Sequence, residues 1–171
     1  MIEMQVAAIA MDARTGAPIV LLNDRQKRRA LPIWIGANEA NAINKVLENI
    51  KPERPMTHDL LLNVITSLGY VVKQVEINEL SRSTYYATIR LSVKDSRVDT
   101  VKDIDARPSD AIALALRSRS PIFVSAQVVA EATIPADLEK DEEEAEAFKQ
   151  FVDGLKASDF KTLGGSGPVS D

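Results

Sequence analysis

Hydrophobic and polar residues alternate at the start of the chain, in the pattern of a half-buried β-strand. Turn-forming residues occupy positions 12–18, and a short apolar run follows at positions 19–22. Two strand patterns on either side of a turn are typical of a β-hairpin, so we predict one here. The side chains that share one face of the first strand, residues 2–11, are Ile2, Met4, Val6, Ala8 and Ala10.

The next region changes from a strand pattern to a helical one. Residues 31–36 (LPIWIG) are compact and apolar, which predicts a buried strand with Trp34 in the core. From Ala37 to Ile50, apolar residues recur at three- and four-residue steps, which predicts a helix that ends at the following Lys-Pro pair.

A second helix is better marked. Thr57 is a capping residue, and Gly69 is a plausible left-handed stop. Its buried stripe is predicted to consist of Leu60, Leu61, Val64, Ile65 and Leu68.

Strand and helix patterns continue to residue 124. Residues 70–80 and 84–94 predict two long paired strands, since the second alternates cleanly between apolar and polar positions. A third helix is predicted to begin after Arg107 and Pro108, and a short strand at 122–124. This irregular mixture predicts an α+β fold with a mixed, largely antiparallel sheet, three packed helices and a C-terminal acidic amphipathic helix.

The C-terminal part differs in composition. Residues 137–146 hold seven acidic residues and one lysine, and residues 139–155 carry an amphipathic stripe that must dock on its own domain or on a protein partner. We therefore predict a domain over residues 1–136, an acidic helical extension over 137–160 and a disordered tail over 161–171.

Composition excludes several kinds of protein and site. The chain has no cysteine and one histidine, which excludes a disulfide framework, a thiol nucleophile and a zinc site with several histidine ligands. No run approaches the roughly 20 apolar residues of a membrane span, and the first residues are typical of a strand rather than a signal peptide. We expect a cytoplasmic protein with no membrane contact and no organic cofactor.

The net charge of −4 is unevenly distributed, because without the acidic segment the chain is slightly positive. That balance is weaker than the strongly basic surface of a generic nucleic-acid binder. One basic cluster, residues 25–29, is either a solvated loop or a contact to a phosphate backbone.

Two predicted helix starts resemble each other. Residues 54–60 (RPMTHDL) and 107–112 (RPSDAI) both contain Arg-Pro, then a hydroxyl, then Asp, then an apolar helix. A purely structural explanation is available: proline suits a first turn, Thr57 and Ser109 or Asp110 cap free N–H groups, and the acid meets the helix dipole.

The same atoms also suit phosphate chemistry. Helix N-termini and arginine side chains bind anions, and a histidine can transfer a proton near neutral pH. Carboxylates can hold Mg²⁺ or Mn²⁺. The candidate residues are, for catalysis, His58, Asp59 and Asp110; for phosphate binding, Arg54, Thr57, Arg107 and Ser109; and for a metal, Asp59, Asp110 and Glu39.

At these residues the chain resembles the bifunctional nuclease family of bacteria and plants. The resemblance spans about residues 3–160 and is carried by LPIWIGANEANA (31–42), RPMTHDLL (54–61), ARPSDAIALAL (106–116) and FKQFVDGLKASDF (148–160). It implies a compact α+β domain that forms a homodimer, and DNase and RNase activity is attributed to plant members.

Two hypotheses from different classes remain open. One is a nuclease, that is, a divalent-metal-assisted phosphodiesterase acting on DNA or RNA. The other is a non-catalytic dimeric module that binds an anionic ligand, or a protein partner through residues 139–155. The first needs the two helix starts to meet in space.

Overall fold

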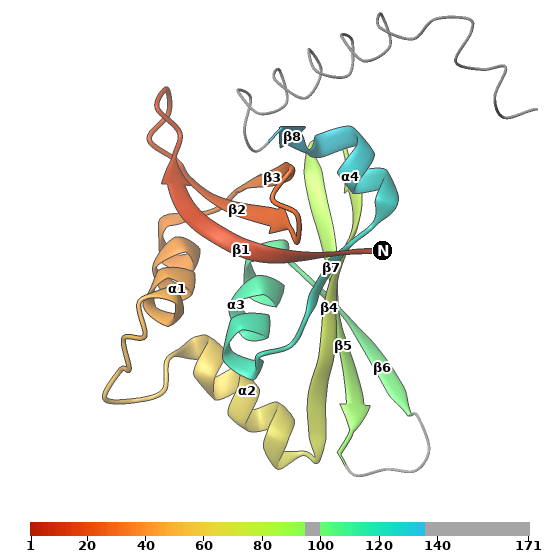
Figure 1. Cartoon of the computed structure of the whole chain (residues 1–171). Coiled ribbons are helices and arrows are strands. Elements are labelled where there is room, and N and C mark those ends of the chain that lie inside the picture. Colours follow the sequence, from red (N-terminus) through yellow and green to blue (C-terminus); the bar gives the residue numbers. More distant parts are fainter. Residues whose placement is uncertain (95–99, 136–171) are drawn as a thin grey trace, which may run out of the picture. The chain divides into compact units, whose positions relative to one another are not determined.

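The computed structural model describes residues 1–94 and 100–135. Within them, eight strands form one sheet in the order β6-β5-β4-β7-β1-β2-β3-β8, and four helices accompany it (Figure 1). All neighbouring strands are antiparallel except β4 and β7, which are parallel. The elements are β1 (Ile2–Met11), β2 (Pro18–Asp24), β3 (Arg29–Trp34), α1 (Ala37–Leu47), α2 (Thr57–Ser67), β4 (Tyr70–Ser81), β5 (Thr84–Val93), β6 (Val101–Ala106), α3 (Pro108–Ser118), β7 (Ile122–Val124), α4 (Ala126–Ala132) and β8 (Ile134–Pro135).

The predicted α+β class with a mixed, largely antiparallel sheet is confirmed. The hairpins β1–β2 and β4–β5, the three predicted helices and the strand β7 are all present. The predicted acidic helix (137–160) and tail (161–171) lie outside the described residues. None of the helices in the described part has the length and apolar character that a membrane crossing needs.

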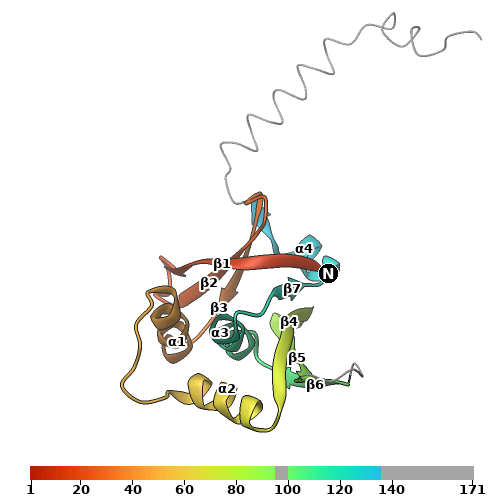
Figure 2. The same cartoon turned by 60° about the horizontal axis from the view of Figure 1, so that its bottom comes forward.

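Helix α3 is the centre of the core. It contacts α1, α2, β4 and β5, and Figures 1 and 2 show the three helices together on one side of the sheet. Its residues from Ala111 to Ala115 are all buried, as expected for a helix that is apolar on every side. The core therefore fixes the direction of α3 and the position of its first turn.

The first strand departs from simple alternation. A bulge between Val6 and Ala8 shifts the pairing of β1 with β2. Because one extra residue exchanges the two faces of a strand, Ala8 is exposed and Ile9 is half-buried. The predicted place of Ala8 on the inner face of β1 is therefore wrong, whereas Ala10 is half-buried.

Helix α1 is shorter than predicted. It ends at Leu47 rather than Ile50, and Asn49 adopts a left-handed backbone with φ 55°. Residue Ile50 is 50% exposed, so it lies outside the helical stripe that buries Ile43.

The predicted buried stripe of α2 is also wrong. Only Ile65 is buried on this helix. The other members form an exposed surface, the α2 apolar face, made of Leu60, Leu61, Val64 and Leu68. Helical spacing identified the amphipathic face correctly, but the described part of the chain does not supply enough neighbours to cover it.

Strand β3 leaves Trp34 54% exposed, so its predicted place in the core is wrong.

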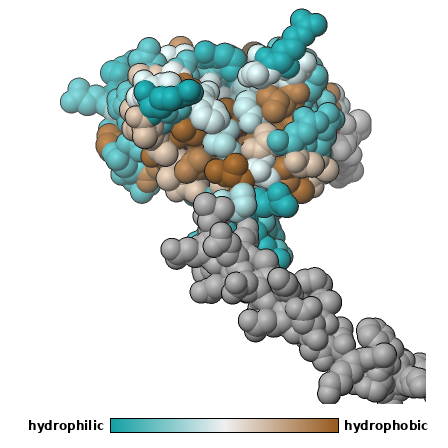
Figure 3. Space-filling model, turned by 90° about the horizontal axis from the view of Figure 1, so that it is seen from above, coloured by the Kyte–Doolittle hydropathy of each residue, from teal (hydrophilic) through white to brown (hydrophobic). Residues whose placement is uncertain are grey.

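Three short elements, β6, α4 and β8, were not predicted from the sequence pattern. The face viewed in Figure 3 has apolar side chains near its centre and hydrophilic ones around its edge.

Candidate functional site

The first turns of α1, α2 and α3 meet around one cleft, which we call the helix-start cleft. Its volume is about 370 Å³. The sequence-predicted residues that line it come from all three helices: Glu39 from α1, Thr57 and His58 from α2, and Arg107 and Asp110 beside or on α3. The two similar helix starts therefore do meet, together with a third.

The helix starts are not capped as predicted. The residues that precede the helices, Met56 and Arg107, have extended backbones and provide no side-chain cap. The Asp59 carboxylate instead accepts the Met56 N–H at 2.9 Å, and Pro108 begins α3. The capping roles predicted for Thr57 and Ser109 are therefore wrong, because the N-cap positions are held by Met56 and Arg107.

Asp110 connects the two helix starts. Its Oδ1 lies 2.9 Å from Nε2 of His58, and its Oδ2 accepts a hydrogen bond from Nε of Arg107 at 2.7 Å. Burial raises the pKa of Asp110, but the hydrogen bonds from Arg107 and His58 and their charges outweigh burial, so the pKa is lowered overall. Asp110 is therefore ionised at neutral pH.

An ionised Asp110 determines how His58 can act. A carboxylate only accepts hydrogen bonds, so Nε2 of His58 must carry the hydrogen that faces it. In the neutral ring Nδ1 then holds the lone pair. The His58 side chain is 12% exposed, so its orientation is fixed by packing as well as by Asp110. This is the arrangement that prepares a histidine to accept a proton.

Arg107 lies between two carboxylates. Its Nη1 is 3.0 Å from Oε1 of Glu39, and its Nε pairs with Asp110. The hydrogen bond to Asp110 raises the pKa of Arg107, as does the charge of Glu39. Arg107, Glu39 and Asp110 together thus carry one more negative than positive charge. The Arg107 side chain is 65% exposed, so a ligand can reach it.

Asp59 is the third residue of α2, as Asp110 is of α3, but it does not line the cleft. Its Oδ1 accepts a hydrogen bond from Nε of Arg117 at 2.6 Å, and Arg117 also donates to the carbonyls of Ala42 and Ala113. Burial raises the pKa of Asp59, whereas the Met56 N–H and Arg117 lower it and prevail. Arg117, 7% exposed, was missed by the sequence analysis.

The remaining candidates lie outside the helix-start cleft. Arg54 is exposed and does not line it. Ser109 is buried and lines a neighbouring pocket that also reaches Arg107. In residues 1–94 and 100–135, no group of three or more His, Cys, Asp or Glu side chains is spaced to hold a metal ion.

The basic cluster at residues 25–29 is engaged elsewhere. Arg25 forms an ion pair with Glu3 at 2.6 Å, and Arg29 donates a hydrogen bond to the hydroxyl of Thr133. The cluster is at the start of β3, whereas the helix-start cleft follows the other end of that strand. These contacts favour the structural interpretation over a phosphate contact.

Comparison with known proteins identifies the family. The family model described as the bifunctional nuclease domain matches residues 20–137, which include all three helix starts. The chain belongs to this family. Nearly its whole length is similar to an uncharacterised protein of Mycobacterium tuberculosis, with 38% identity over 167 residues, covering 93% of this chain and 98% of that protein.

Plant relatives match over a smaller part of their own length. Bifunctional nuclease 1 of Oryza sativa subsp. japonica is 30% identical over 118 residues, covering 67% of this chain and 35% of the rice protein. Bifunctional nuclease 2 of Arabidopsis thaliana is 30% identical over 141 residues, covering 82% of this chain and 36% of the Arabidopsis protein. The chain thus corresponds to about a third of these plant proteins.

Proposed function

We propose that the protein is a nuclease that hydrolyses phosphodiester bonds of DNA or RNA in the helix-start cleft. The observation that carries the proposal is the chain of contacts from His58 through Asp110 to Arg107, which joins a proton acceptor to an anion-binding side chain. The similarity to plant proteins named bifunctional nucleases supports the same activity.

The residues divide the reaction between them. Arg107 and the open N–H groups of the helix starts bind the phosphate oxygens. His58 accepts a proton at Nδ1 from a water molecule as the water oxygen bonds to phosphorus. The bond from phosphorus to the leaving sugar oxygen then breaks, and that oxygen takes a proton from solvent water while His58 returns its own proton to solvent. Asp110 stabilises the positive charge that develops on His58.

The charge of the cleft favours a divalent cation as a partner of the substrate. Glu39 and Asp110 both contact one guanidinium, so their carboxylates already converge on a position that attracts positive charge. Mg²⁺ commonly uses one or two carboxylates and completes its shell with water and phosphate oxygens. For Mg²⁺ or Mn²⁺ to bind between Glu39 and Asp110, the guanidinium of Arg107 that now lies between them would have to move toward the phosphate. The metal would then offset the negative charge of the phosphate. Asp59, predicted as a ligand, is committed to Arg117.

The test is cleavage of labelled single-stranded DNA and RNA by the purified chain with Mg²⁺, Mn²⁺ or EDTA. His58→Ala and Arg107→Ala are expected to lower the rate about 100-fold or more, since each removes a group that acts in the transition state. Arg54→Ala is the matched control, because Arg54 has the same place in its motif and lies outside the cleft.

The proposal is wrong if no cleavage occurs with either metal, or if His58→Ala and Arg107→Ala cleave as fast as the unaltered chain. A loss of the same size in Arg54→Ala would also contradict the assignment of the phosphate to Arg107. Melting curves of every variant show whether a lost activity reflects loss of the fold.

The alternative, a non-catalytic dimeric module, is favoured by one observation. The α2 apolar face is exposed over Leu60, Val64 and Leu68, at 57%, 46% and 70%. A homodimer would cover such a face. We expect a mass near twice 18.7 kDa in solution, reduced to 18.7 kDa by Leu60→Glu with Leu68→Glu. A dimer that melts at higher temperature with phosphate-containing ligands but shows no turnover would support this alternative.

A further inference from the structure

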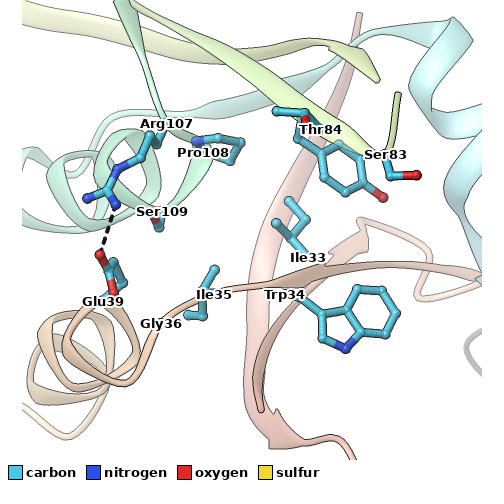
Figure 4. A pocket seen from close by; sticks show the side chains of 11 residues that line it. Ile33, Trp34, Ile35, Gly36, Glu39, Ser83, Thr84, Arg107, Pro108 and Ser109 are labelled. Atoms are coloured by element: carbon cyan, nitrogen blue, oxygen red, sulfur yellow. Dashed lines mark ion pairs between the residues drawn. The ribbon is translucent and has the colours of Figure 1, made fainter. Parts of the chain in front are cut away.

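A second pocket adjoins the helix-start cleft and shares Arg107 and Glu39 with it. Its volume is about 460 Å³, within the range of small-molecule sites. Figure 4 shows Arg107 and Glu39 at one end, Trp34 and Ser83 at the other, and Ile33 and Ile35 between them. One cavity therefore has a charged end and an aromatic end, and Tyr85 also lines it.

The indole of Trp34 is held in a defined orientation although it is 54% exposed. Its Nε1 donates a hydrogen bond to Oδ2 of Asp12 at 2.9 Å. The other oxygen of Asp12 accepts the backbone N–H groups of Arg14 and Thr15 at 2.9 and 3.1 Å. The hydrogen bond from Trp34, and then these two, lower the pKa of Asp12, so the acceptor is ionised at neutral pH.

A large apolar ring that is exposed and also immobilised is a ready surface for stacking. Apolar side chains are normally more stable when buried, and fixing the indole removes its rotational freedom before any ligand arrives. Nucleobases stack on aromatic side chains of proteins that bind single strands. Across the pocket, Arg107 provides the guanidinium that phosphate binds.

We propose that this pocket binds an unpaired nucleobase on Trp34 while the adjoining phosphate lies at Arg107, so that the nuclease acts on single strands. The inference rests on the proposed function for its phosphate site. A base inside a duplex is stacked between its neighbours and cannot present a free face to the indole. Single-stranded segments therefore enter the pocket, and duplexes are excluded unless a nucleotide is extruded.

The experiment measures binding to the full chain in EDTA, so that no turnover is needed. The probes are labelled oligothymidylate, an abasic oligonucleotide of the same length, and a duplex. Trp34 is the only tryptophan of the chain, so quenching of intrinsic fluorescence reports directly on this ring. We expect quenching by oligothymidylate and little by the abasic strand or the duplex.

Substitutions give the size of the effect. Trp34→Ala should weaken oligothymidylate binding about 5- to 150-fold, the effect of losing one stacked base. Trp34→Phe should retain most of the affinity, because a smaller ring still stacks. Ile50→Ala is the control, since it removes an apolar side chain that is 50% exposed and lines neither pocket, so it should leave binding unchanged.

The abasic strand separates stacking from a structural effect. It retains the phosphates but has no bases, so Trp34→Ala should bind it as well as the unaltered chain does. An equal loss on both strands, unchanged binding of oligothymidylate by Trp34→Ala, or no binding of single strands at all would overturn the proposal. Stacking without cleavage in Mg²⁺ or Mn²⁺ would leave the base site standing and refute the nuclease, so the two failures are distinguishable.

Discussion

The two helix starts with the same motif have different surroundings, and their aspartates differ accordingly. Asp110, at the start of the fully packed α3, lies between His58 and Arg107 at the cleft surface. Asp59, at the start of the half-exposed α2, points inward to the buried Arg117. One carboxylate therefore lines the cleft, and the other pairs with a buried arginine.

The difference shows that a motif specifies local geometry but not the neighbours that give an acid its role. Both aspartates are three residues beyond a non-capping residue, Met56 or Arg107. Only Asp59 reaches back to a backbone N–H, because Arg107 has a side chain that occupies Asp110 instead. The residue three positions before each aspartate, Met56 or Arg107, therefore decides which partner that aspartate finds.

The largest expected effect separates the two aspartates by activity. Asp110→Asn should lower nuclease activity about 100- to 10,000-fold, since His58 loses the charge that orients it and stabilises its protonated form. Asp59→Asn, corrected for any loss of folded protein, should retain activity within about tenfold, because the carboxylate of Asp59 pairs with Arg117 and does not line the cleft. Equal losses of activity in Asp110→Asn and Asp59→Asn would contradict the different roles of the two carboxylates.

The stability of the fold should depend on the contact of Asp59 with Arg117, although activity depends on Asp110. Arg117→Met removes the hydrogen bonds that Arg117 donates to the carboxylate of Asp59 and to the carbonyls of Ala42 and Ala113, which should lower the free energy of unfolding by about 2–3 kcal/mol. Urea unfolding measures this change. With Asp59→Asn present as well, the loss should be smaller than the sum of the two single losses; additive losses would mean that the pair does not interact.

Acid should destabilise the protein partly through these same groups. The folded-state pKa values of Asp59 and Asp110 lie below the ordinary 3.8. Their contribution is therefore complete above 3.8 and is lost as pH falls through the lower folded values, because the unfolded chain binds protons first. Urea midpoints across this range should fall less steeply in Asp59→Asn, and an unchanged slope would contradict the role of Asp59.

The smallest expected effect concerns the other partner of Arg107. A Cβ at Gly36 would meet the side chain of Glu39 in the first turn of α1. Because that carboxylate is at the end of a flexible side chain, Gly36→Ala should displace it from Arg107 and cost at most about 1 kcal/mol of stability. A higher metal concentration for half-maximal cleavage, without loss of the fold, would support Glu39 as a ligand; an unchanged metal dependence would count against it.

Sequence patterns predicted most of the fold because local periodicity reports burial on one side of an element. The alternation of β5 is confirmed, with Ala87, Ile89 and Leu91 all buried. Periodicity failed where tertiary neighbours decide the outcome. The stripe of α2 is apolar but uncovered, and Trp34 lies in an apolar run yet is more than half exposed.

The candidate site was predictable in its residue types and not in its pairings. Five of the predicted residues line one cleft, whereas Asp59 does not: Glu39, Thr57, His58, Arg107 and Asp110. The partner of Asp59, Arg117, is 58 residues away in the sequence, and no local pattern connects them. The usable signal was an arginine in the last turn of the apolar helix α3, because a buried arginine needs an acidic partner.

The three-residue strand β7 joins the two halves of the sheet. It lies between β4 and β1, and its Ile122 is opposite Met4 in one neighbour and Val75 in the other. During synthesis the ribosome must release almost the entire described chain before these three residues can pair. A chain truncated ahead of residue 122 would leave two unjoined β-meanders with exposed edges, so the domain matures late and as a whole.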